Sequence, residues 1–305
     1  MLNIVGKRYW FFGLSLLLIV PGIAALAVWG LPLAIDFTGG SLLEVRFEGA
    51  QAPAPAQVVD LYRELGYGEP LVQSAAQAEI IARSRTLDES ERAALVRGMQ
   101  DQFGGTVTML RFESVGPAVG AEVTRRAGGA VGLAALGILA YITYAFRSVP
   151  GAYRYGLAAI VAMLHDVAVV LGVAAILGHF FGWEVDALFL TALLTIIGFS
   201  VHDTIVVFDR IRENQRLYRR LDYELLVNHS IVQTLDRSIN TQLTVMLTLL
   251  ALLLFGGVTT RRFVTVLLIG ILSGTYSSIF NAAPLLVVWH NREWRRWFRR
   301  RAGAV

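Results

Sequence analysis

The sequence predicts a mainly α-helical membrane protein with six transmembrane helices and an α+β domain between the first and the second of them. Three observations support this class. The 305-residue chain contains six long apolar segments, its composition is 55% hydrophobic and only 16% charged, and a long polar insert follows the first segment. Soluble domains carry about 25% charged residues, so this chain has too little charge to solvate a globule of its size. The composition also excludes a disordered chain, and the absence of cysteine excludes a disulfide scaffold and thiol chemistry.

The first apolar segment, residues 9–35, contains no charged residue over 27 positions. A bilayer core needs about 20 helical residues, so this segment is long enough to span it. A signal peptide is the competing interpretation, but the run is too long for one and no clear small-residue cleavage site follows it. The five further predicted spans are residues 127–146, 155–183, 187–208, 238–260 and 263–291.

The Lys and Arg residues indicate the orientation, because short cytoplasmic loops carry an excess of them. With the N-terminus inside, the short outer loops hold only Arg261 and Arg262. The inner segments hold Lys7, Arg8, Arg147, Arg154, Arg210, Arg212, Arg216, Arg219, Arg220, Arg237, Arg292, Arg295, Arg296, Arg299, Arg300 and Arg301. Both termini are therefore expected in the cytoplasm. The basic charge is a topology signal rather than a phosphate-binding face, so no nucleic-acid partner is expected.

Residues 36–126 are expected to form the extracytoplasmic domain. Glycines close its two predicted helices, and Pro55 and Asp88 stand near their starts, as is common at helix ends. The predicted elements are strand 42–47, helix 55–65, strands 70–74 and 79–84, helix 89–103 and strand 106–114. The order β-α-β-β-α-β is that of the ferredoxin-like fold.

Two charged segments are expected inside the cell. In residues 210–237, Leu217, Leu221 and Leu225 recur every four residues among charged ones. This spacing predicts an amphipathic helix that lies on the membrane surface or packs on a neighbouring subunit. Residues 292–305 form the second segment, a basic cytoplasmic tail.

Two acids interrupt the predicted spans: Asp166 in the third and Asp203 in the fourth. An ionisable residue at membrane depth is costly and is a candidate functional site. Arg237 opens the fifth span, and antiparallel packing would bring it near Asp203, with Thr241 one turn further along. An arginine that approaches and leaves a buried carboxyl could load and unload a proton. The alternative is a static ion pair that only holds the bundle together.

The remaining motifs limit the chemistry. His165 and His202 each precede an intramembrane aspartate, which permits a shuttle role but more often marks a buried structural histidine. No metal-ligand spacing is present, so no metal is expected. Neither a P-loop nor a nucleophile elbow occurs, which argues against an ATPase. Two Gly-x-x-x-Gly motifs, 128–132 and 270–274, favour close helix packing.

Four motifs resemble the SecD/SecF family of membrane proteins. IDFTGG follows the first span at residues 35–40, and GFSVHDTIVVFDRIREN occupies residues 198–214. Residues 230–244 and GTYSSIFNAAPLL at 274–286 match as well. The layout of one span, an outside domain and five clustered spans also agrees, so the resemblance covers nearly the whole chain.

The resemblance implies an RND-type six-helix bundle in the bacterial cytoplasmic (inner) membrane, with SecD as the partner that supplies a pseudo-symmetric other half. It implies that the pair uses the proton-motive force to promote export of unfolded polypeptide through the SecYEG channel after SecA-driven translocation. YajC and YidC are further candidate partners. No enzymatic reaction and no cofactor are implied.

Carried over by position, the proton-pathway residues are Asp203, Arg237 and Thr241, and the secondary candidates are Asp166, His202 and Asp36. His202 departs from the family pattern, in which Asn is common before the intramembrane aspartate. Two other functions stay open. One is half of an RND-type small-molecule exporter, against which the small outside domain argues. The other is a non-conducting structural assembly factor, which predicts that Asp203 and Arg237 tolerate substitution.

Overall fold

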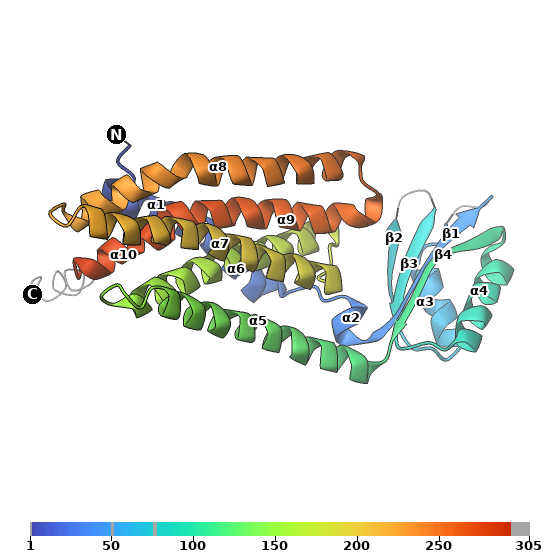
Figure 1. The fold of residues 1–305 in the computed structure, drawn as a ribbon. Coiled ribbons are helices and arrows are strands. Elements are labelled where there is room, and N and C mark those ends of the chain that lie inside the picture. Colours follow the sequence, from blue (N-terminus) through green and yellow to red (C-terminus); the bar gives the residue numbers. More distant parts are fainter. Residues whose placement is uncertain (1, 50–51, 76–77, 294–305) are drawn as a thin grey trace, which may run out of the picture. The chain divides into compact units, whose positions relative to one another are not determined.

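The computed structural model describes residues 2–49, 52–75 and 78–293, and the chain divides into two compact units. A helical unit comprises Met1–Pro32 and Gly129–Val305, and the second unit comprises Leu33–Gly128 (Figure 1). The predicted basic tail lies outside the described residues from position 294 onward.

Six helices among the described residues are long and apolar enough to cross a membrane, which confirms the predicted class. The last span is continuous through three elements, α9, η2 and α10 (Figure 1). The helices and their bounds are η1 (Val5–Lys7), α1 (Arg8–Trp29), α5 (Pro117–Ala145), α6 (Ala152–Phe181), α7 (Ala187–Leu217), α8 (Tyr223–Phe255), α9 (Val258–Ser277), η2 (Ser278–Ala282) and α10 (Ala283–His290).

The π-helical turn η2 has a local cause in Pro284. Proline has no backbone N–H, and its ring crowds the carbonyl four residues earlier, so a regular α-helical pattern cannot run through this point. A wider π-turn at Ser278–Ala282 accommodates the proline, and such turns are frequent at functional sites.

The first span ends earlier than predicted. Helix α1 stops at Trp29, where Gly30 adopts a φ of 73° and donates its N–H to the carbonyl of Leu26. This positive φ favours glycine. Ile35 belongs instead to a short helix, α2 (Ile35–Thr38), in the second unit.

The predicted amphipathic helix within residues 210–237 is wrong. Helix α7 runs on to Leu217 and α8 starts at Tyr223, with the Asp222 carboxylate accepting a hydrogen bond from the backbone N–H of Glu224. Hydropathy marks only the apolar part of a helix, whereas these two helices continue past it and pack on one another there. Their buried contacts there are Ile211, Leu226, Val227 and Ile231.

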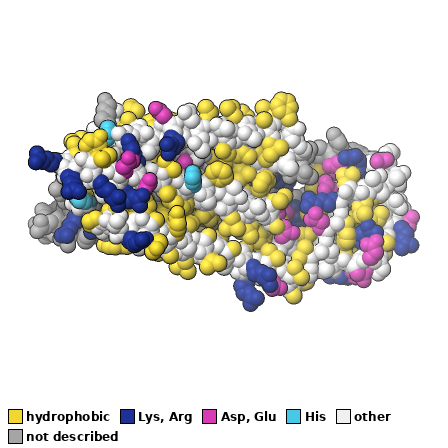
Figure 2. Space-filling model, in the orientation of Figure 1, with side chains coloured by type: hydrophobic (Ala, Val, Ile, Leu, Met, Phe, Trp, Pro, Cys, Tyr) yellow, Lys and Arg dark blue, Asp and Glu magenta, His cyan; other side chains and the backbone are white. Residues whose placement is uncertain are grey.

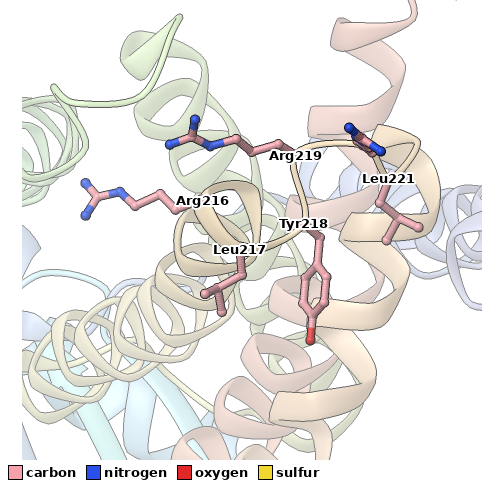
Figure 3. Close-up of a pocket in the computed structure, with 6 residues that line it drawn as sticks. Arg216, Leu217, Tyr218, Arg219 and Leu221 are labelled. Atoms are coloured by element: carbon pink, nitrogen blue, oxygen red, sulfur yellow. The ribbon is translucent and has the colours of Figure 1, made fainter.

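The turn between α7 and α8 is exposed. Figure 3 shows Arg216 and Arg219 pointing away from it and Tyr218 pointing along α8, around an open surface hollow that Leu217 and Leu221 also line. Lys and Arg side chains gather at this end of the helical unit (Figure 2).

A charged clasp joins three elements at this end. The Arg8 guanidinium at the start of α1 donates to Glu224 of α8 at 2.9 Å and to Glu293, after α10, at 2.6 Å. The Asn228 carbonyl oxygen accepts the backbone N–H groups of Ile4 and Val5. The clasp therefore places the start of the described chain and residue 293 at the same end of the bundle.

Close helix crossings depend on glycine. A Cβ on Gly172 of α6 would lie 2.5 Å from the Cα of Gly22 on α1, so neither position has room for a side chain. The motif 270–274 is used in the same way, because a Cβ on Gly270 would collide with Ile196 of α7. The motif 128–132 is not used in this way within the described residues, because a Cβ on Gly128 or Gly132 would meet none of their atoms within 4 Å.

The second unit has the predicted ferredoxin-like topology. Its strands β1 (Gly40–Glu48), β2 (Leu71–Ala75), β3 (Glu79–Ser84) and β4 (Thr106–Val115) form an antiparallel sheet of order β2-β3-β1-β4. Helices α3 (Pro55–Glu64) and α4 (Glu89–Phe103) lie together on one face of the sheet (Figure 1). Alternate residues of β1, namely Leu43, Val45 and Phe47, point into the core of this unit. Helices α3 and α4 contribute Val58, Tyr62, Leu95 and Met99 to the same core.

The two ends of this unit meet. A Cβ on Gly39 would lie 2.8 Å from the Cα of Pro117, and one on Gly120 would lie 2.7 Å from the Gly39 nitrogen. The Thr124 hydroxyl donates to the Phe37 carbonyl at 3.1 Å. Helix α2 and the first turns of α5 are thus packed backbone to backbone.

Candidate functional site

Asp203 lies in the middle of α7 and is buried, with 2% of its surface exposed. Its Oδ2 accepts a hydrogen bond of 2.5 Å from the Gln242 Nε2 of α8. Gln242 is itself buried, and within the described residues its Oε1 has no hydrogen-bond partner. Among the described residues, the side-chain hydrogen bond of this buried acid is thus to a neutral amide.

Arg237 and Thr241 lie on α8 with exposed side chains. The buried positions of this part of α8 are Ser238 and Gln242, each one residue later. One residue corresponds to about 100° around a helix, so Arg237 and Thr241 occupy the face beside the one that packs on α7. Among the described residues, neither forms an ion pair or a hydrogen bond with Asp203. The structure brings Gln242, not Arg237, to the carboxylate.

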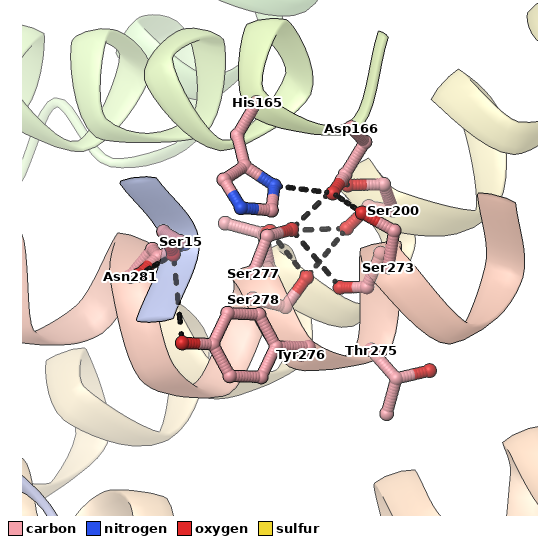
Figure 4. A network of polar contacts seen from close by, with 12 residues as sticks. Ser15, His165, Asp166, Ser200, Ser273, Thr275, Tyr276, Ser277, Ser278 and Asn281 are labelled. Atoms are coloured by element: carbon pink, nitrogen blue, oxygen red, sulfur yellow. Dashed lines mark hydrogen bonds and ion pairs between the residues drawn. The ribbon is translucent and has the colours of Figure 1, made fainter. Parts of the chain in front are cut away.

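Asp166 on α6 is fully buried and lies in a dense polar cluster (Figure 4). Its Oδ2 accepts the hydroxyls of Ser200 at 2.6 Å and Ser277 at 2.7 Å. Its Oδ1 accepts the Ser273 hydroxyl at 2.7 Å and lies 3.0 Å from the Nδ1 of His165. Polar groups from α6, α7 and α9 thus converge on one carboxyl group.

A second layer of hydrogen bonds extends this cluster. Ser278 donates to the Ser200 carbonyl at 3.0 Å and lies 2.9 Å from the hydroxyl of Thr204, the residue after Asp203. Tyr276 donates its hydroxyl to the Phe11 carbonyl of α1 at 2.7 Å. The polar contacts therefore connect α1, α6, α7 and the α9–η2 span.

His202 and Asp36 are the remaining candidates from the sequence. His202 precedes Asp203 but has an exposed side chain. Asp36 is half-buried in α2 and belongs to the second unit. No group of three or more His, Cys, Asp or Glu residues that could hold a metal ion occurs in the part of the chain that the structure describes.

Sequence reasoning missed the partners of both acids. Gln242, Ser200, Ser273 and Ser277 carry no charge, so hydropathy gives them little weight. One signal was available: Ser238 and Gln242, like Ser273 and Ser277, are four residues apart and share a helix face.

Comparisons with known proteins agree on one family. The family model described as "Protein export membrane protein SecD/SecF, C-terminal" matches residues 96–292, and that of the "SecD/SecF GG Motif" matches residues 24–51. The chain is 58% identical to the protein translocase subunit SecF of Anaerolinea thermophila, over 99% of this chain and 98% of the relative. It is 52% identical to the same subunit of Thermobaculum terrenum, over 98% of each.

Solved structures agree as well. The crystal structure of SecDF from Thermus thermophilus, a translocon-associated membrane protein, matches with a TM-score of 0.79 and 38% identity. The match covers 95% of this chain and 39% of the SecDF chain. A second SecDF structure, in a super-membrane-facing form, matches with a TM-score of 0.68, 36% identity and coverage of 98% and 40%. The chain thus spans about two fifths of SecDF.

Proposed function

The chain belongs to the SecD/SecF family of protein export membrane proteins, and on that premise we propose that it is a protein translocase subunit that couples proton movement to protein export. Because it matches only 39% of SecDF, we propose a separate SecD-type chain as the partner that supplies the rest. Six apolar helices make it a multi-pass membrane protein.

The observation that carries the proton-coupling proposal is the environment of Asp203. A carboxyl that exchanges a proton needs a neighbour that accommodates both of its forms. The Gln242 amide can donate through Nε2 to the carboxylate, and through Oε1 it can accept from the protonated acid. The free Oε1 of Gln242 is consistent with this exchange.

Arg237 and Thr241 complete the proposed relay. Both lie beside the buried face of α8 that carries Gln242. A rotation of α8, or closure of the partner subunit on it, would move the Arg237 guanidinium toward Asp203. A nearby positive charge favours the ionised carboxyl and so promotes proton release.

The proposed orientation places both termini in the cytoplasm of a bacterial inner membrane. It is supported by the clasp of Arg8, Glu224 and Glu293, which unites both ends of the described chain, and by the basic residues at that end (Figure 2). The sheet unit would then lie outside, where it would assist an unfolded polypeptide leaving the SecYEG channel after SecA-driven translocation. YajC and YidC are proposed as further partners.

The test is proton flux in membrane vesicles that carry the chain with its SecD-type partner. Asp203→Asn and Arg237→Met are compared with wild type at equal expression, together with proton-dependent export. Asp209→Asn is the matched control, because Asp209 is an exposed acid of the same helix paired with Arg212. We expect flux and export to fall at least about tenfold in the first two variants, as for the loss of a proton-transfer group, and to be unchanged in the control.

Unchanged flux in Asp203→Asn, with the complex assembled, would contradict the relay. It would favour the structural assembly factor instead. The names of the relatives, all protein translocase subunits, favour export over small-molecule transport.

A further inference from the structure

The imidazole of His165, in the helical unit, has a buried ring nitrogen without a hydrogen-bond partner among the described residues. Its Nδ1 lies 3.0 Å from the Asp166 Oδ1, and its Nε2 is buried and has no partner in the described structure. A buried polar atom without a partner is rare in native structures and calls for an explanation.

The hydrogen bonds at Asp166 limit the explanation. An ionised carboxylate only accepts, whereas a protonated carboxyl must also donate. Three serine hydroxyls lie 2.6–2.7 Å from Asp166, two at Oδ2 and one at Oδ1. A carboxylate accepts from all three at once, whereas a protonated Asp166 needs one hydroxyl to accept from it, a role open to Ser277, which also lies 3.2 Å from the Gly274 carbonyl. The carboxylate is therefore the form that keeps all three hydroxyls as donors to Asp166.

Charge balance points to the same atom. The groups that face the pair are Ser200 of α7, Ser273, Tyr276 and Ser277 of α9, and, through Tyr276, Ser15 of α1 (Figure 4). Nearby on α7, Asp203 contacts Gln242 and His202 is exposed. Among these groups His165 alone can become positive, and a buried anion without a counter-charge is strongly unfavourable.

We propose that His165 and Asp166 form a second intramembrane proton-binding site, in which Asp166 remains a carboxylate and the Nε2 of His165 takes up and releases the proton. Proton binding at this pair follows from the geometry alone. Its role as a second station in proton-driven export rests on the function proposed above.

The site is placed to affect helix packing. The His165 ring lies against the Tyr276 ring, with centroids 6.0 Å apart, and Tyr276 holds the Phe11 carbonyl of α1. Ser15 and Asn281 form the adjacent contact between α1 and η2. A change of charge at His165 therefore acts where α1, α6 and the last span meet.

The test is ¹⁵N NMR of the full chain in lipid nanodiscs, with labelled histidine, over a pH series. His165→Gln identifies the resonances of His165 by their loss, and His202→Gln is the matched control for an exposed intramembrane histidine. We expect the His165 ring nitrogens to change from one protonated nitrogen to two as pH falls. We expect Asp166→Asn to lower the midpoint of that change by at least about one pH unit, since an adjacent charge shifts titration by this order.

A wild-type spectrum in which His165 keeps one protonated nitrogen at every pH from 5 to 8 would overturn the proposal. That spectrum decides even where Asp166→Asn does not fold. A midpoint that Asp166→Asn leaves unchanged would also overturn it. Failure of the Asp203 relay would appear separately, as unchanged flux in Asp203→Asn with His165 still titrating.

Discussion

Asp166 and Asp203 are both buried acids on neighbouring helices of one unit, but they differ in what surrounds them. Asp166 is enclosed by three serine hydroxyls and an imidazole, whereas Asp203 contacts one amide. Burial is nearly the same at both positions. The comparison teaches that two carboxyls at similar burial can differ widely in how many polar neighbours hold them, which is why we propose the less crowded one, Asp203, for the relay.

The comparison is tested most strongly by removing each charge in turn. Asp166→Asn replaces one carboxylate oxygen, which accepts hydrogen bonds from serine hydroxyls in the wild-type chain, by an NH₂ group, which only donates. Each buried polar group left unsatisfied costs about 1–3 kcal/mol. Asp203→Asn can keep an amide–amide hydrogen bond with Gln242, so we expect a loss below about 1 kcal/mol. Unfolding of the purified chain in mixed micelles measures both. Equal losses would contradict the comparison.

Glu293, which lies outside the spans, is a third buried carboxyl that can be compared with Asp166 and Asp203. Burial alone would raise the pKa of Glu293, but hydrogen bonds from Arg8, Tyr9 and Asn291 outweigh it and hold that pKa below its usual value. A carboxyl with a lowered pKa in the folded state contributes stability above its unfolded pKa, and this is lost as pH falls through the folded pKa.

Glu293→Gln should therefore destabilise the chain at pH 7 by about 1.5 kcal/mol, the typical size for a hydrogen bond to a charged group. The difference from wild type should shrink as pH falls below about 4. Unfolding measured across pH checks both statements. Glu213→Gln is the control, because Glu213 forms an exposed pair with Arg210 that contributes little. A difference that grows toward low pH would contradict the assignment.

The smallest effect concerns single serines. Ser277→Ala removes one donor from Asp166 and should cost about 1 kcal/mol. Ser238 is an equally buried serine whose hydroxyl has no partner in the described chain, so Ser238→Ala should be neutral or slightly stabilising. The two variants are compared in the same unfolding assay. Similar losses for both would show that the hydroxyls around Asp166 have no particular importance.

Much of the fold could be predicted because its signals are local. Long apolar runs predicted the six spans, and the β-α-β-β-α-β order of the predicted elements predicted the topology of the sheet unit. The structure of residues 210–237 could not be predicted in this way. The Leu217, Leu221 and Leu225 spacing suggested a separate helix, but the side chains that pack there are Leu226, Val227 and Ile231.

The site was only half predictable for a physical reason. A charge within an apolar run is conspicuous, so Asp166 and Asp203 could be identified from the sequence. Their partners are neutral residues on other helices, and the rotation of those helices about their axes depends on tertiary packing. The role of Arg237 and Thr241 stays a prediction, because a turn of about 100° separates their face of α8 from Gln242.

The junction of Gly39, Pro117 and Gly120 has a mechanical consequence. Strands β1 and β4 are the first and the last strand of the unit in the sequence, and they are hydrogen-bonded neighbours in the sheet. They pair from Gly40 with Val115 to Glu48 with Thr106. A force that pulls Gly39 and Gly116 apart would open this ladder from the Gly40 end, one bond at a time. The contact of α2 with α5 holds that end of the ladder together. We expect the unit to resist unfolding under such a force more strongly than the same sheet without this contact.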